Sequence, residues 1–288
     1  MMLKAKQKGF TLLELLVVIT LLAILSVGAL VAYDGLTEKA QASATANNTA
    51  SVDRAIRQYK VIAQTFPDQW DNLGASGAGV TTGTPSLADA TTAWLANYGS
   101  AAAGFASVAA ALEEAGLEEF QVADDTIVAG VVPNLQHNEG ATDGASAEVE
   151  ADDLENIAIV AVQGLAATKL DGSSVTAADN SRLNKINDSF EDDETNLVVA
   201  FGFGHDAAHS TTDSKVAIAQ PATYTSAAVD PSKNYARYIG LFHVGHSNGA
   251  AATLADLEFH DKAHFIGIVD PEGNGIDDNI AEAIANEN

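Results

Sequence analysis

The sequence contains no cysteine, so no disulfide bond can hold its loops together. It also has few basic residues: 14 lysines and arginines stand against 39 aspartates and glutamates, which gives a formal net charge of −25. So acidic a surface repels nucleic acid, because phosphates are bound through Lys and Arg, and we expect no nucleic-acid partner. The charge favours solubility and cation binding instead. With 47% hydrophobic residues, the chain is too apolar to be intrinsically disordered.

Charge is missing altogether from one long stretch, which runs from Leu15 to Tyr33. With the residues just before it, this stretch forms an apolar segment over residues 10–33. As a helix the segment would be about 36 Å long, enough to cross a membrane with some tilt. The preceding leader, residues 1–9, holds three lysines and no acid. We therefore expect the leader to face the cytoplasm and the rest of the chain to be exported.

The order of leader and apolar segment differs from that of an ordinary secretory signal. Such a signal has a shorter apolar core, with small residues for cleavage after it. Here the apolar run is longer, and the candidate cleavage residue, Gly9, precedes it. Cleavage after Gly9 would remove the leader and leave the apolar helix on the mature protein. Phe10 would then carry a free, positively charged amine.

Glu14 is the unusual residue of the apolar segment. A carboxylate within a membrane helix costs on the order of a few kcal/mol and is usually paired. Glu14 lies about one helical turn after Phe10, so it can pair with the Phe10 amine of its own chain or of a neighbouring chain. An intermolecular pair would fix the axial register of packed subunits. The alternative is an ordinary membrane anchor with an acid near its cytoplasmic end.

The start of the chain resembles the prepilin motif of type IV pilins and type II secretion pseudopilins, through the residues Lys8-Gly9-Phe10-Thr11-Leu12-Leu13-Glu14-Leu15-Leu16-Val17-Val18. The resemblance implies cleavage between Gly9 and Phe10 by a prepilin peptidase and methylation of the Phe10 amine. It implies that Glu14 neutralises the N-terminus of a neighbouring subunit.

The same resemblance implies a location and a set of partners. Before assembly the subunit would cross the inner membrane once, with its N-terminus in the cytoplasm. It would then join a helical, homo-oligomeric filament in the periplasm or outside the cell. An inner-membrane assembly platform and a cytoplasmic ATPase would extend that filament.

The segment after the membrane predicts a continuation of the same helix over residues 34–66, ended by Pro67. Apolar residues recur there at spacings of three and four, which gives the helix one apolar face. That face consists of Val52, Ile56, Tyr59, Ile62 and Phe66. The remainder, residues 67–288, is expected to form an acidic globular domain. Its order of elements favours an α+β fold, in which the long helix packs on short helices and an antiparallel sheet.

Within the globular domain, helices are predicted over residues 86–98, 103–115 and 277–285, the second closed by Gly116. Strands are predicted where Val, Ile, Phe and Tyr are enriched. These strands cover residues 126–132, 157–162, 197–203, 215–219, 235–244 and 263–269. Long acidic connections rich in Gly, Asn and Ser lie between them, at residues 134–153, 170–180 and 187–196.

A loop near the C-terminus has the composition of a calcium site. Oxygen-bearing side chains at alternate positions, a glycine at the turn and a further acid suit a hard cation such as Ca²⁺. Asp270, Glu272, Asn274 and Asp278 would supply side chains, and Ile276 a backbone carbonyl. The pattern resembles acidic calcium loops, and major pseudopilins are stabilised by calcium in their C-terminal loop. The alternative is a Gly/Asp-rich turn before the final helix.

A Gly-x-Ser-x-Gly pattern surrounds Ser247, as in the nucleophile elbow of α/β-hydrolases. Its triad partners would be Asp256 or Asp270 and His260 or His264. No clear series of βα units precedes the pattern, and a Gly/Ser/Asn turn beside a strand explains it more simply. We therefore do not expect an enzyme, and a membrane-anchored serine hydrolase is the alternative from another class.

The seven histidines include three close pairs, which are His205/His209, His243/His246 and His260/His264. Two of these pairs have a spacing of four residues, which puts both side chains on one face of a helix or strand, so a zinc pair is one interpretation. Structural or surface histidines are the simpler one.

Taken together, the patterns predict a structural subunit of a type IV pilus-like or pseudopilus filament. The globular part is large for a major subunit. A minor pilin or adhesin-like tip subunit is therefore the alternative within the same class.

Overall fold

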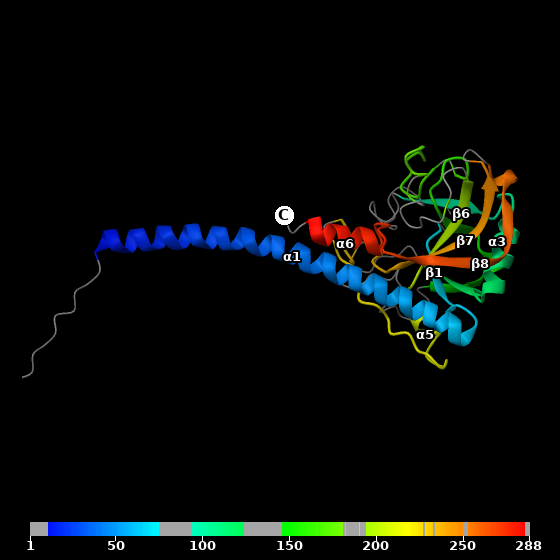
Figure 1. Cartoon of the computed structure of the whole chain (residues 1–288), viewed down its shortest axis with the longest axis horizontal. Coiled ribbons are helices and arrows are strands. Elements are labelled where there is room, and N and C mark those ends of the chain that lie inside the picture. Colours follow the sequence, from blue (N-terminus) through cyan, green and yellow to red (C-terminus); the bar gives the residue numbers. More distant parts are fainter. Residues whose placement is uncertain are drawn as a thin grey trace, which may run out of the picture.

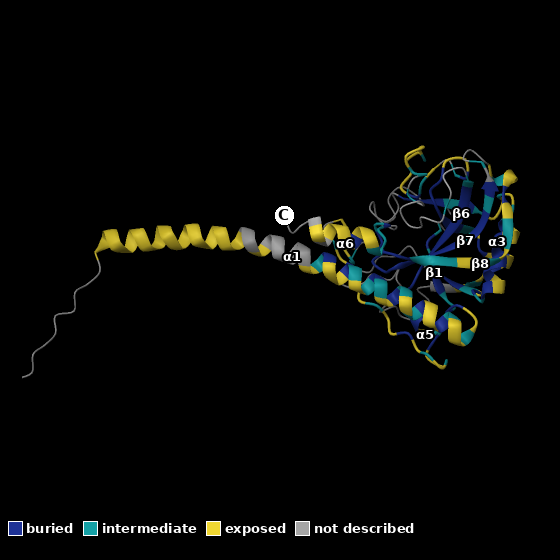
Figure 2. Cartoon of the chain, in the orientation of Figure 1, coloured by how far each residue is buried: buried dark blue, intermediate teal, exposed yellow. Residues whose placement is uncertain are grey.

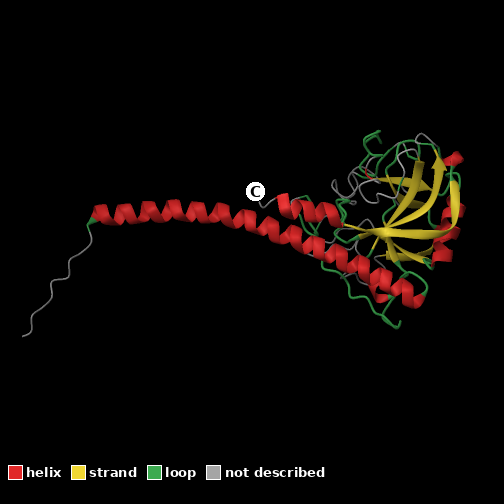
Figure 3. Cartoon of the chain, in the orientation of Figure 1, coloured by secondary structure: helices red, strands yellow, loops and turns green. Residues whose placement is uncertain are grey.

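The computed structural model describes residues 11–74, 94–123, 146–166, 168–180, 182, 190, 194–226, 228–232, 234–249 and 253–285. Over these residues the molecule consists of one long helix and a compact part that we call the head, which comprises the described residues after Ala63 (Figure 1). Figure 3 shows that the strands are confined to the head and that the long helix lies along its outside. The predicted α+β class is confirmed.

Helix α1 spans Leu12–Ala63 and runs without a break through both the apolar segment and its predicted continuation. The chain leaves the helix at Gln64, which has a left-handed conformation with φ of 67°. The helix therefore ends before Pro67, and not at the proline as predicted. The backbone N–H of Gln64 still bonds to the carbonyl of Lys60, at 3.0 Å, which closes the last turn.

The two ends of α1 differ in their surroundings (Figure 2). Every residue from Thr11 to Leu30, which we call the free half, is exposed. The packed half, residues 41–63, lies against the head and buries one face. Its buried residues are Ala42, Thr45, Thr49, Val52, Ile56 and Tyr59. Ile62 was expected on this face but is 49% exposed.

The head contains an eight-stranded sheet. Its strands are β1 (Trp70–Asn72), β2 (Leu95–Gly99), β3 (Glu119–Ala123), β4 (Ser146–Glu150), β5 (Asn156–Val160), β6 (Glu194–Gly202), β7 (Ile239–Asn248) and β8 (Glu258–Val269). The order is β2-β5-β6-β1-β3-β4, and β7 pairs with β6 on one side and with β8 on the other. All pairs are antiparallel except β1 with β3, which is parallel.

Three α-helices and two 3₁₀ turns complete the described elements of the head. They are α3 (Phe105–Ala115), α5 (His205–His209), α6 (Ile276–Ala285), η2 (Ala151–Asp153) and η3 (Leu254–Asp256). Helices α3 and α6 confirm two predictions, and Gly116 ends α3 in a left-handed conformation with φ of 88°. Helix α6 lies beside the packed half of α1 (Figure 1). The packed half therefore contacts both α6 and β8.

Several predicted elements were wrong or incomplete. Residues 95–98, predicted as helical, belong to β2, because they pair with β5 and three of the four are buried. The predicted connections 134–153 and 187–196 include β4 and the start of β6. No strand forms at residues 215–219. The predicted strand 126–132 and the first part of the predicted helix 86–98 lie outside the described residues.

An aromatic cluster joins the end of α1 to the sheet. The ring of Phe66, just after α1, lies 5.3 Å from that of Phe242 on β7. Trp70 contacts Phe242 at 5.3 Å and Phe203 at 5.0 Å, so one set of rings connects the helix end, β1 and β7. A side chain at Gly240 would begin 2.4 Å from the Trp70 ring, so only glycine fits there. This core fixes the position of α1 relative to the head.

Candidate functional site

The N-terminus of α1 is closed by a capping box between Thr11 and Glu14. The Glu14 carboxylate accepts hydrogen bonds from the backbone N–H of Thr11 at 2.9 Å and from its hydroxyl at 3.0 Å. The Glu14 N–H in turn donates to the Thr11 hydroxyl at 3.2 Å. The Thr-x-x-Glu pattern is a known helix start, so the sequence contained a signal for the role of Thr11 that sequence reasoning missed.

This geometry gives Glu14 a partner within its own chain. Its carboxylate satisfies the otherwise unpaired N–H at the start of the helix. Gly9 and Phe10 lie outside the described residues. The pairing of Glu14 with a Phe10 amine, the cleavage after Gly9 and the methylation of Phe10 therefore stay predictions.

The free half of α1 exposes a continuous apolar surface. Among the described residues, Leu12–Leu30 is the one helix segment long and apolar enough to cross a membrane. Its large side chains make no buried contact in the single chain, as Leu12 at 86% and Leu30 at 73% exposure illustrate. So much apolar surface is unfavourable in water and requires lipid or other helices around it.

The packed half is held by polar as well as apolar contacts. The Arg57 guanidinium donates to the carbonyl of Ile266 on β8 at 2.6 Å and lies 5.0 Å from the centre of the Phe265 ring. It also forms an ion pair with Asp53 at 2.8 Å, one turn earlier on the helix. Closer to the membrane end, the Gln41 amide donates to the Thr225 hydroxyl at 3.0 Å. The head is thus joined to α1 over the length of its packed half.

The loop predicted to bind calcium is organised by Asp270. Its side chain is fully buried, and one carboxylate oxygen accepts the backbone N–H groups of Glu272 and Asn274, both at 2.9 Å. Burial raises the pKa of Asp270 to about 6, which the hydrogen bonds from Asn274 partly oppose. Gly273 has a φ of 81°, and a side chain there would begin 2.7 Å from Trp94. The glycine is therefore required both for the turn and for the close approach.

The other predicted calcium ligands have partners of their own. The Tyr224 hydroxyl donates to Glu272, and the Asp278 carboxylate accepts the N–H of Gly275 at 3.3 Å, where α6 begins. Within the described residues, the clusters of at least three acidic or histidine side chains with ligand atoms within 4.8 Å of one another do not include these carboxylates. Binding of Ca²⁺ would require Glu272 and Asp278 to turn towards Asp270, and it stays a prediction.

Arg182 and Trp94 fasten this loop to the rest of the head, and neither was predicted. Arg182 donates to the carbonyls of Glu272 at 3.4 Å and Gly273 at 3.3 Å, and Trp94 donates to that of Pro271 at 3.0 Å. Burial lowers the pKa of Arg182, while the negative charges of Asp179, Asp278 and Asp270 oppose that shift. No sequence motif marks these residues.

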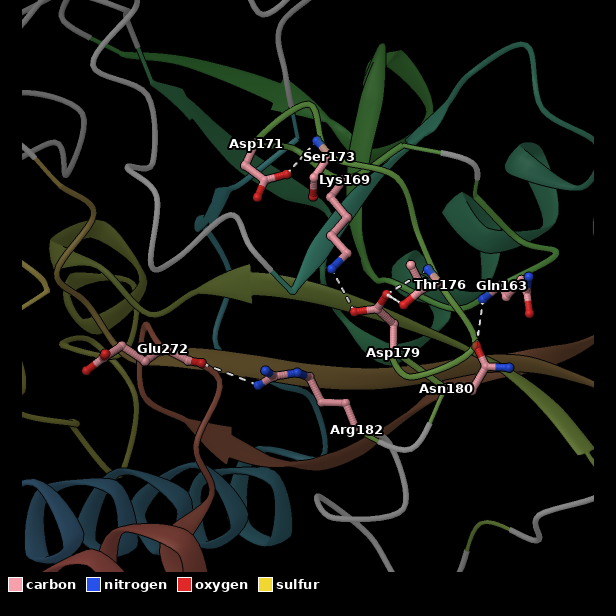
Figure 4. A network of polar contacts seen from close by, with 9 residues as sticks. All are labelled: Gln163, Lys169, Asp171, Ser173, Thr176, Asp179, Asn180, Arg182 and Glu272. Atoms are coloured by element: carbon pink, nitrogen blue, oxygen red, sulfur yellow. Dashed lines mark hydrogen bonds and ion pairs between the residues drawn. The ribbon is translucent and has the colours of Figure 1, made fainter.

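A second set of polar contacts holds the segment that carries Arg182 (Figure 4). Lys169 and Asp179 form an ion pair at 2.7 Å, and Asp179 also accepts the backbone N–H of Thr176 at 2.7 Å. The Asn180 side chain accepts the N–H of Gln163 at 2.8 Å. Through Arg182, this network connects the middle of the chain to the C-terminal loop in a protein without disulfides.

The elbow geometry expected of a hydrolase does not form at Ser247. Ser247 is buried inside β7, opposite Thr195 on β6, and the strand continues to Asn248. A nucleophile elbow needs a sharp turn from strand to helix that exposes the serine. The proposed acid Asp256 instead caps η3, where it accepts the Thr253 N–H at 2.9 Å, and Asp270 holds its own loop.

The histidine pairs have different arrangements. His205 and His209 stack on α5, with ring centres 5.9 Å apart. The other two pairs come together across β7 and β8, where His243, His246 and His260 form a cluster of ligand atoms within 4.8 Å. The sequence showed the two pairs but did not show that they meet.

Residues 4–30 match the family model of the prokaryotic N-terminal methylation motif. The chain thus carries the prepilin signature of type IV pilins and pseudopilins, as its first residues predicted. Comparisons with curated proteins and with solved structures gave no significant match.

The signature and the exposed apolar helix together support a type IV pilin-like or pseudopilin precursor. The N-terminal helix fits anchoring in a membrane before assembly. The motif implies, in general, processing by a prepilin peptidase and assembly into a filament, which is a structural role.

Proposed function

We propose that this chain is a structural subunit of a type IV pilus-like or type II secretion pseudopilus filament. In this proposal a prepilin peptidase cleaves after Gly9, and the new N-terminus at Phe10 is methylated. Before assembly, the subunit spans the inner membrane with its N-terminus in the cytoplasm. An assembly platform and its ATPase then move it into the filament.

The observation that carries the proposal is the free half of α1. It is apolar, exposed on all sides, and continuous with a packed half that is joined to the head by buried contacts. Moved from lipid into a bundle of identical helices, the free half would exchange one apolar environment for another. The heads would then cover the bundle and present their acidic surface outwards.

Glu14 tests the assembly step. Glu14→Gln keeps an oxygen that can accept the Thr11 hydrogen bonds and removes the charge, whereas Glu14→Ala removes both. If the charge pairs with a neighbouring Phe10 amine, both variants are cleaved normally. The amount of filament recovered in sheared surface fractions should then fall strongly for both. If Glu14→Gln assembles as well as the native chain, Glu14 acts only as a helix cap and the intermolecular pair is wrong.

A minor or tip subunit is the second candidate, and the size of the head favours it. The two roles differ in where the subunit lies along the filament. Gold-labelled antibody against the head should mark the whole length for a major subunit and the end for a tip subunit. The same preparation, assayed for hydrolysis with and without Ser247→Ala, tests the hydrolase alternative, for which we expect no activity above background.

We also propose Ca²⁺ as the ligand of the C-terminal loop, through Asp270, Glu272, Asn274, Asp278 and the carbonyl of Ile276. The buried carboxylate of Asp270 supports it, since a cation would offset the cost of its charge. The midpoint of thermal unfolding should rise with Ca²⁺ and fall with a chelator. An equal response in Asp270→Ala/Asp278→Ala would overturn the site.

A further inference from the structure

Three histidines meet on the β7–β8 hairpin. His243 and His246 lie on β7 and His260 on β8, and one ring nitrogen of each lies within 4.8 Å of the other two. The ring centres are 4.7 Å apart for His243 and His260, 5.2 Å for His246 and His260, and 6.2 Å for His243 and His246. Among the described strands β8 pairs with β7 alone, so the hairpin lies at one edge of the described sheet.

Two irregularities in strand pairing bring these side chains together. In a regular strand, residues three apart face opposite sides, which would separate His243 from His246. Against β6, however, His243 pairs with Val198 and Gly245 with Leu197, so Val244 is an extra residue. On β8, the segment 260–263 lies opposite Val244 alone. Bulges of this kind re-aim side chains and are frequent at functional sites.

Two ring nitrogens of the cluster have no hydrogen-bond partner among the described residues. They are the Nε2 atoms of His243 and His260, and both are buried. Buried polar atoms are nearly always paired, so each exception needs an explanation. Asn196, directly opposite His246 on β6, likewise leaves its side-chain oxygen buried and without a partner. Three unsatisfied atoms therefore come from this one region of the sheet.

The state of the rings suits metal binding. The His243 ring has a hydrogen bond to the backbone of Gly245, which orients it and leaves Nε2 for another partner. Burial, together with the neighbouring imidazoles, lowers the pKa of His243 to about 4, and burial also lowers the pKa of His260. A neutral imidazole has a lone pair on one ring nitrogen, and this lone pair can bind a metal ion. Phe190 packs edge-on against His243, with ring centres 5.0 Å apart.

We propose that His243, His246 and His260 bind a divalent transition-metal ion, with Zn²⁺ the expected occupant. Zinc takes imidazole nitrogens at about 2.0–2.1 Å in tetrahedral geometry, which places them about 3.3 Å from one another. The observed nitrogens lie within 4.8 Å of one another, so binding of zinc would draw the three rings closer together. Ca²⁺ and Mg²⁺ prefer oxygen ligands, so the site is chemically distinct from the Asp270 loop.

A metal ion here would hold the sheet edge together. It would tie the irregular part of β8 to β7 in a chain that has no cysteine. The fourth ligand is a water molecule or His264, whose ring centre lies 5.1 Å from that of His260. Because the site lies in the head, it does not depend on the role proposed for the chain in a filament.

The test is a zinc titration of the full chain in detergent, purified through a tag without histidine and stripped of metal. We expect one Zn²⁺ per chain by calorimetry and elemental analysis, with a micromolar or tighter Kd. His243→Ala/His260→Ala should weaken binding at least about tenfold. The matched control, His205→Ala/His209→Ala, removes the stacked pair on α5 and should bind as the native chain does. Asp270→Asn should also leave zinc binding unchanged.

The proposal is overturned if the native chain binds Zn²⁺ no more tightly than His243→Ala/His260→Ala, or if the α5 variant is the one that loses binding. Tryptophan fluorescence during unfolding without metal shows whether each variant is folded. If the double variant is not, His246→Gln, which removes a single ring of the cluster, is judged by the same criterion. Equal binding by native chain and His246→Gln would then reject the site.

Discussion

The two halves of α1 belong to one unbroken helix but differ in what they bury. The free half exposes apolar side chains, and the packed half buries some polar ones. The free half carries large apolar side chains, and all of them are exposed. The packed half buries two threonines, Thr45 and Thr49, within its contact face. Thr49 satisfies its hydroxyl by donating to the carbonyl of Thr45 at 2.9 Å, so the polar group is buried at little cost.

This contrast shows where each half finds its partners. The packed half obtains them from α6, β8 and the aromatic core of the head. The free half obtains none from its own chain, so its stability in water depends on lipid or on other subunits. Substitutions in the packed half should therefore change folding of the head, and substitutions in the free half should change assembly.

The largest effect is expected for Ile56→Ala in the packed half. Ile56 is fully buried, and removal of such a side chain costs about 2–5 kcal/mol of unfolding free energy. Denaturant unfolding can be followed by the fluorescence of Trp70 and Trp94, which are both buried in the head. Ile19→Ala, in the free half, should leave that unfolding curve unchanged and reduce filament yield.

A nearby control lies on the same helix. Ile62 is about half exposed, so Ile62→Ala should shift the unfolding free energy by no more than about 0.5 kcal/mol. If Ile56→Ala and Ile62→Ala behave alike, or if Ile19→Ala destabilises the head, the division of α1 into two halves is wrong.

The next largest expected effect is a change of stability with pH, caused by Asp270. This residue lies in the loop between β8 and α6, and α6 packs against α1. Its pKa in the folded protein is about 6, above the ordinary value of 3.8. Folding therefore favours the protonated carboxyl, and this contribution is complete below about pH 4 and lost as the pH rises through 6. Each unit corresponds to about 1.4 kcal/mol, so the loss is on the order of 2–3 kcal/mol.

Asp270→Asn should abolish this loss. In buffer with a chelator, the native chain should become less stable from pH 4 to pH 7.5 relative to Asp270→Asn, as measured by denaturant unfolding at each pH. Parallel curves for the two proteins would show that Asp270 does not titrate in this range. Added Ca²⁺ at pH 7.5 should stabilise the native chain and not the variant if the proposed calcium site exists.

The parts of the fold that follow from short-range patterns were predictable. The apolar segment, the start of α6 after a Gly/Asp-rich turn, and the end of α3 at Gly116 each depend on residues close together in sequence. Strand β2 was missed because Leu95-Ala96-Asn97-Tyr98 has no clear alternation, and its pairing with β5 decides its conformation. Strand β4, Ser-Ala-Glu-Val-Glu, was missed because it lies within a polar connection, and its pairing with β3 decides its conformation.

The candidate sites differ in the same way. A site formed by residues close together in sequence was predictable, and sites formed by distant residues were not. Gly9, Phe10 and Glu14 form one local motif, and the family match covers it. The fastening of the Asp270 loop by Arg182 and Trp94 joins residues far apart in sequence, so no spacing marks it. The histidine cluster needs an extra residue at Val244 and a second irregularity in β8, and strand periodicity alone predicts that His243 and His246 face apart.

Apart from the control variants, the smallest loss of stability is expected for Arg57→Ala, at the contact between the packed half and β8. The substitution removes the hydrogen bond to the Ile266 carbonyl and the contact with the Phe265 ring. Because the Arg57 side chain is 51% exposed, water replaces part of what is lost, and we expect about 1 kcal/mol of destabilisation. Arg57→Lys should recover little of it, since lysine lacks the planar fork of donors. Arg54, exposed on the same helix, gives the control: Arg54→Ala should leave the unfolding curve unchanged, and an equal loss in both variants would indicate a general charge effect instead of this contact.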